Sequence, residues 1–204
     1  MPEQKILKDK KNIKWQPRYD SENLDGAWNA AGDQILFYTV PQGQADAGGA
    51  VKTNFETNVV TAGIMPNREA FDAIALSVYF WDTQHLTISE IRSIYENVRA
   101  TVSFNIRDTQ YLQLPVQRFG AGWSLAGFLS DDGNAAPVAR DQWVQGTGDP
   151  RSIYSFVPHP VFVPELTPFD ITVRFQSAPP AFLAGRDTRM FVSLEGTTFI
   201  PVYK

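Results

Sequence analysis

The chain has 204 residues, a net charge of −4 and no cysteine, so disulfide bonds and thiolate metal sites are excluded. No apolar run reaches the roughly 18 residues of a membrane-spanning helix, and the basic N-terminus lacks the apolar stretch of a signal peptide. Hydrophobic residues make up 43% and charged residues 20%, which is ordinary globular usage. We therefore expect a soluble, folded protein that is made in the cytoplasm.

The first 18 residues are basic although the whole chain is acidic. They contain six basic side chains against only Glu3 and Asp9. This asymmetry predicts that the segment contacts an acidic partner, which could be nucleic acid, lipid head groups or a neighbouring copy. The alternative is a disordered, solubilising terminus. Trp15 and Tyr19 favour an ordered arm, because large aromatic side chains usually bury their rings.

We predict a basic arm over residues 1–24 and a single domain over residues 25–204. The residues expected to contact the acidic partner are Lys5, Lys8, Lys10, Lys11, Lys14 and Arg18.

Short apolar stretches between loops rich in proline and glycine predict strands along most of the chain. The first lies over 34–40 and is followed by a flexible loop and a weaker extended stretch over 50–58. The clearest strand lies over 73–81, where apolar residues fall on both faces, as in the middle of a sandwich.

One helix is expected over 87–98. Thr87 and Glu90 have the spacing of a capping box, and apolar residues recur every three or four positions after it. That apolar stripe consists of Ile88, Ile91, Tyr95 and Val98.

Strands resume at 100–106 and 111–116, with a turn between them, and a long glycine-rich loop follows over 119–150. The remaining predicted strands cover 153–157, 161–163, 169–176, 189–194 and 199–203. Eight or nine strands with one inserted helix fit an all-β fold, an antiparallel two-sheet jelly-roll sandwich with an extended N-terminal arm. Parallel sheets are excluded because strands and helices do not alternate.

Catalytic and metal-binding residues are not expected, so we predict neither an enzyme nor a bound cofactor. His85 and His159 are the only histidines, and neither lies in a nucleophile motif. Asp131 and Asp132 lie in a polar turn that lacks the spacing of a calcium loop. An enzyme that uses carboxylates alone, as glycosidases do, is a weaker alternative.

Aromatic residues in the long loop are the candidate surface contacts. Trp81 ends an apolar strand and is expected in the core. Trp123, Phe128 and Trp143 lie in the loop and, with Trp15, are predicted interface residues. Trp123 and Trp143 could instead lie in the core or stack on a ligand, since tryptophan suits all three environments.

The order of features resembles the single-jelly-roll major capsid proteins of tailless icosahedral bacteriophages. The resemblance rests on the basic arm and on three stretches: FNIRDTQYLQLPVQRF at 104–119, FDITVRF at 169–175 and MFVSLEGTTFIPVY at 190–203. The last looks like a final β-hairpin. The resemblance implies a structural protein of the virion that self-assembles into an icosahedral shell.

The resemblance implies copies of itself and other capsid proteins as partners, and an arm that meets nucleic acid or an internal membrane. Such a protein would have no small-molecule substrate. The alternative function is a carbohydrate- or receptor-binding β-sandwich of the spike or lectin type, in which Trp123 and Trp143 would stack on sugars.

Overall fold

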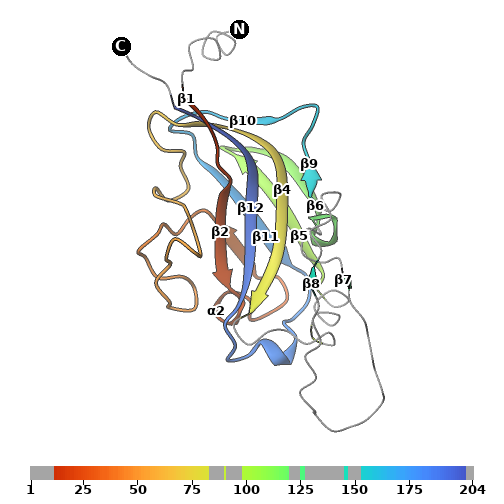
Figure 1. Cartoon of the computed structure of the whole chain (residues 1–204). Helices are drawn as coiled ribbons and strands as arrows, with labels where there is room; N and C mark the ends of the chain where they lie inside the picture. The colour runs from red at the N-terminus through yellow and green to blue at the C-terminus, as the bar shows by residue number, and fades with distance from the viewer. Residues whose placement is uncertain are drawn as a thin grey trace.

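The computed structural model describes residues 12–82, 90, 98–119, 125–126, 145–146 and 153–200. Two antiparallel sheets pack face to face in this part of the chain (Figure 1). The predicted all-β sandwich is therefore confirmed. No helix among the described residues is long and apolar enough to cross a membrane.

The larger sheet contains six strands, and its two central members, β4 and β12, each have 13 residues. The smaller sheet has the order β3-β11-β5-β6. The larger sheet comprises β1 (Asn12–Trp15), β2 (Arg18–Asn23), β4 (Ala70–Asp82), β9 (Tyr154–Ser155), β10 (Val161–Val163) and β12 (Thr188–Ile200). The smaller sheet comprises β3 (Gln34–Phe37), β5 (Ala100–Ile106), β6 (Thr109–Pro115) and β11 (Phe169–Phe175).

Short elements complete the described chain. The two-residue strands β7 (Leu125–Ala126) and β8 (Gln145–Gly146) pair with each other, and the helical turns are α2 (Leu24–Ala27), η1 (Val116–Phe119) and η3 (Ala181–Leu183). Of the helix predicted over 87–98, only Glu90, which is helical, and Val98, which is not, are described.

The strand order is that of a jelly roll. β1 and β2 lie end to end along β12, and β9 and β10 lie end to end along β4, so each sheet has four strand positions. Numbered along the chain, the first position pairs with the last, the second with the seventh, the third with the sixth and the fourth with the fifth. This nested pairing is that of one long hairpin rolled up on itself. The β4–β12 and β5–β11 pairs connect strands from successive layers of the roll, and so complete the two sheets.

The core lies between the sheets and follows strand alternation. In β5, Val102, Phe104 and Ile106 are buried while the residues between them are partly exposed. Trp28, just after α2, closes one end of the core: its ring stacks on Phe175 at 4.2 Å and its indole N–H donates to the Ser177 carbonyl at 2.8 Å.

The predicted boundary between arm and domain at residues 24 and 25 does not divide the structure. β1 and β2 both pair with β12 inside the larger sheet, so residues 12–23 belong to the sandwich. The sequence RYDSEN of β2 does not predict a strand of the sandwich because it is polar, yet most of its residues are buried.

The predicted final hairpin is wrong. Residues 188–200 form one strand that runs along β4, with a register shift between Glu195 and Gly196. A Cβ atom at position 196 would lie 2.0 Å from the Asp72 carbonyl oxygen. Gly196 therefore lets the strand bulge and continue where the sequence predicts a turn.

Candidate functional site: a buried charge network

Two carboxylates of β2 are buried on the same side of the strand. Asp20 and Glu22 are two residues apart, so their side chains leave the same face. Asp20 is wholly buried and Glu22 is 3% exposed. A buried carboxylate is costly without a partner, so the fold must supply one.

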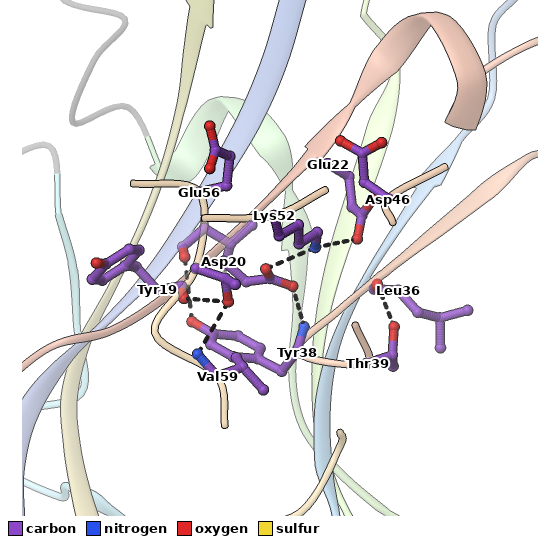
Figure 2. A network of polar contacts seen from close by, with 12 residues as sticks. Tyr19, Asp20, Glu22, Leu36, Tyr38, Thr39, Asp46, Lys52, Glu56 and Val59 are labelled. Carbon is purple, nitrogen blue, oxygen red and sulfur yellow. Dashed lines mark hydrogen bonds and ion pairs between the residues drawn. The ribbon is translucent and has the colours of Figure 1, made fainter. Parts of the chain in front are cut away.

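The partner is Lys52, which comes from the segment between β3 and β4 and is 1% exposed. Its Nζ lies 2.8 Å from Asp20 Oδ1 and 2.5 Å from Glu22 Oε1, so one ammonium is shared by two carboxylates (Figure 2). The backbone holds Lys52 in place, because its N–H donates to the Gln44 carbonyl and its own carbonyl accepts from Gly43.

Backbone groups occupy the remaining carboxylate oxygens. The Tyr38 N–H donates to Asp20 Oδ2 at 2.6 Å, and the Ala47 N–H donates to Glu22 Oε2 at 3.4 Å. The Tyr38 hydroxyl donates to the Arg18 carbonyl at 2.7 Å (Figure 2 shows the ring beneath Asp20). Tyr38 itself has φ of 68°, a left-handed conformation that a non-glycine residue rarely adopts.

A second buried ion pair, between Arg189 and Asp46, holds the same 41–58 segment. Arg189 of β12 lies 2.8 Å from Asp46 and 3.0 Å from Asp187. Asp46 and Lys52 thus hold the 41–58 segment against β12 and β2, respectively.

Burial sets the electrostatics of the network. It raises the pKa of Asp20 and of Glu22, and the ammonium of Lys52 opposes that rise in both cases. Burial also raises the pKa of the Tyr38 hydroxyl, and the Asp20 charge adds to that rise. With one cation for two carboxylates, the cluster favours retention of a proton by one of the acids.

The chemistry available here is that of an amine held beside a carboxyl group without water. The described residues contain no group of three or more acidic or histidine side chains arranged to hold a metal ion. The network can hold the 41–58 segment against β2. It also places the Lys52 amine, a nucleophile, beside the Asp20 carboxyl group, an electrophile.

The predicted arm contacts are only partly described. Lys14 and Trp15 lie on β1 and are exposed. Arg18 is a correction: it is 7% exposed and its guanidinium forms an ion pair with Glu69, so its charge is paired within the chain. Lys5, Lys8, Lys10 and Lys11 lie outside the described residues.

The other predicted residues are not brought together. His159 is exposed in a turn where its N–H donates to the Phe156 carbonyl. Trp81 is half-buried and packs edge-on against Phe55 at 5.2 Å, on the outside of the larger sheet rather than in the core cluster. His85, Trp123, Phe128, Asp131, Asp132 and Trp143 lie outside the described residues.

Sequence reasoning missed Asp20, Glu22 and Lys52. The signal in the sequence was weak: two acids at strand spacing inside RYDSEN, and a lone lysine in a loop rich in glycine and alanine. Asp20 and Glu22 lie 32 and 30 positions before Lys52 in the sequence, so no local pattern connects the three residues and only the fold brings them together.

The outer face of the smaller sheet has a polar hollow of about 540 Å³. Its floor consists of side chains at the outward positions of β3, β5, β6 and β11. They include Gln34, Thr101, Ser103, Asn105, Gln113, Thr172 and Arg174.

A comparison with protein-family models found no match for this chain, and a comparison with curated proteins found none either. The resemblance to phage capsid proteins therefore stays a prediction from the sequence.

Proposed function

We propose that this chain is a major capsid protein, a single-jelly-roll subunit of a virion that self-assembles into an icosahedral shell. The observation that carries the proposal is the nested strand pairing of the two sheets. Double-sheet jelly rolls with eight strands recur in viral capsid domains and in lectins. The choice between these two depends on what the surface offers to a partner.

The edge of the larger sheet favours a protein partner. β1 pairs with β12 along one side, and on it Ile13 and Trp15 are 61% and 64% exposed. Exposed apolar side chains on an edge strand promote pairing with another chain, and tryptophan is enriched where interfaces concentrate their binding energy. We therefore place a contact with a neighbouring copy at β1, with Lys14 between the two apolar residues.

The contact at β1 can be tested by measuring particle mass across ionic strength. We expect the purified protein to grow into rings, sheets or shells in a salt-dependent way, as seen by light scattering and negative-stain microscopy. The variant Trp15→Ala should fold normally but assemble weakly. Val60→Ala is the matched control, because Val60 is 73% exposed but belongs to no strand.

One result would count against a shell protein and another against the contact at β1. A monomer or small oligomer under every condition would contradict self-assembly. Equal loss of assembly in Trp15→Ala and Val60→Ala would contradict the contact at β1.

The polar hollow on the smaller sheet favours a second candidate, a carbohydrate-binding module. Hydroxyl, amide and guanidinium groups on a concave face suit a ligand rich in hydroxyl groups. Glycan-array binding that is lost in Arg174→Ala and kept in Trp15→Ala, with no large assembly in solution, would support this candidate over the capsid.

A further inference from the structure

We propose that Lys52 and Asp20 form an intramolecular isopeptide bond, with Glu22 as the group that transfers the protons. The three side chains bring the groups that would react into contact. The amine nitrogen is 2.8 Å from Asp20 Oδ1, and Glu22 Oε1 touches the same nitrogen at 2.5 Å. Figure 2 shows Lys52 pointing between the two carboxyl groups.

The site excludes water. The side chains of Lys52 and Asp20 have no exposed surface, and that of Glu22 is 4% exposed. Tyr38 and Thr57 beside them are also wholly buried. Burial favours the neutral acid of Asp20 over its carboxylate, and the neutral acid is the form that an amine attacks.

The step balances in atoms and charge. One proton moves from the Lys52 ammonium to Asp20, which leaves a neutral amine, a carboxylic acid and one carboxylate on Glu22. The amine lone pair attacks Asp20 Cγ and forms the C–N bond. Glu22 takes a proton from the nitrogen and delivers it to Oδ1, the C–O bond breaks, and one water molecule leaves. Glu22 ends as the carboxylate it was.

The other oxygen of Asp20 is held as the reaction requires. Oδ2 accepts the Tyr38 N–H at 2.6 Å, so a backbone donor faces the oxygen on which negative charge develops during attack. In the product, this oxygen becomes the amide carbonyl and keeps the same partner.

The product also removes two ionisable groups from the interior. Three such groups share the site before the reaction, whereas the amide is neutral and only Glu22 remains ionisable. The bond would tie the 41–58 segment covalently to β2, which occupies an edge position of the larger sheet.

Peptide mass after trypsin digestion of denatured wild-type protein tests the proposal. No lysine or arginine lies between Arg18 and Lys52, or between Lys52 and Arg68. Without the bond, trypsin releases peptides 19–52 and 53–68. With it, Lys52 resists cleavage, and the product is peptide 19–68, lighter than its sequence by one water molecule.

Three variants assign the roles. Lys52→Arg should give the two separate peptides at full mass, and Glu22→Gln should slow bond formation about a hundredfold or more. Asp20→Asn should lose ammonia in place of water if the bond still forms. Lys14→Arg, which changes an exposed lysine of β1, is the control and should keep the crosslinked peptide. Circular dichroism confirms that each variant is folded before its peptides are weighed.

The wild-type measurement needs no variant and decides the matter alone. Folded protein that yields peptides 19–52 and 53–68 at their full sequence masses would overturn the proposal. A succinimide at Asp25–Gly26 would also remove one water molecule, but it would leave Lys52 open to trypsin, and that result would overturn the proposal too.

Discussion

Lys52 takes the place of water as the hydrogen-bond partner of two carboxylates that are buried in the fold. Its ammonium contacts Asp20 and Glu22 while backbone N–H groups occupy the remaining oxygens. Removing one partner of such a cluster leaves a buried charge without compensation, which costs far more than the pair contributes. The identity of these three residues is therefore tightly constrained, although none of them belongs to the hydrophobic core.

Glu22 should make the stability of the protein depend on pH. Burial raises its pKa above the ordinary value of 4.5, so the folded state holds its proton more tightly than the unfolded state. The stabilisation linked to this proton is complete below about pH 4.5 and is lost as pH rises through the folded-state pKa. We expect the free energy of unfolding of wild type, relative to Glu22→Gln, to fall as pH rises from 4.5 to 7.

Urea denaturation of both proteins at several pH values measures this difference. Glu22 remains titratable whether or not Lys52 and Asp20 are joined, so the expectation does not depend on the isopeptide bond. A relative free energy of unfolding that stays flat or rises with pH would contradict it.

At the scale of elements, the two long strands β4 and β12 form the centre of the larger sheet. β12 pairs with β1, β2 and β4, so every other strand of that sheet contacts one of the two. The pairing passes Gly196, where the strand shifts register against β4 and approaches the Asp72 carbonyl oxygen closely.

Gly196→Ala should destabilise the protein. The added Cβ would lie 2.0 Å from the Asp72 carbonyl oxygen, which is backbone and cannot rotate away. We expect a loss of about 1–3 kcal/mol in the free energy of unfolding, the usual cost of overpacking. Chemical denaturation measures the loss, and Thr197→Ala in the same strand is the control. Equal stability of the two variants would show that the strands separate at the bulge without cost.

At the scale of the molecule, the predicted basic arm includes two strands of the sandwich. Residues 12–23 complete the larger sheet, and Arg18 pairs with Glu69. Residues 1–11 carry Lys5, Lys8, Lys10 and Lys11, four of the predicted contacts with an acidic partner. A truncation that tests the arm must therefore stop before β1.

Deletion of residues 1–11 should leave the unfolding transition unchanged and weaken assembly at low salt, because it removes positive charge but none of the strands in the described part of the chain. Deletion of residues 1–18 should also lower the free energy of unfolding by roughly 1–3 kcal/mol, since it removes β1 and the partner of Glu69. Thermal unfolding and light scattering on the two truncations separate these effects. Equal stability of the two would contradict the assignment of β1 to the sheet.

Much of the architecture could be predicted because each strand carries its own signal. The alternation of apolar residues in 100–106 and 169–175 depends only on neighbouring positions, and β5 and β11 form there as expected. β2 has no such alternation, because the side chains that it buries are polar. Their burial depends on Lys52, more than 25 residues away.

The sequence by itself determined the all-β class, most strand positions and the absence of disulfides, since these follow from local pattern and composition. Only the tertiary structure decided that β2 belongs to the sheet, that β12 is one strand, and that Asp20, Glu22 and Lys52 meet. Each of these depends on a contact between distant residues, such as Gly196 with Asp72 or Lys52 with Asp20. Such contacts arise when the chain rolls up, and no local pattern records them.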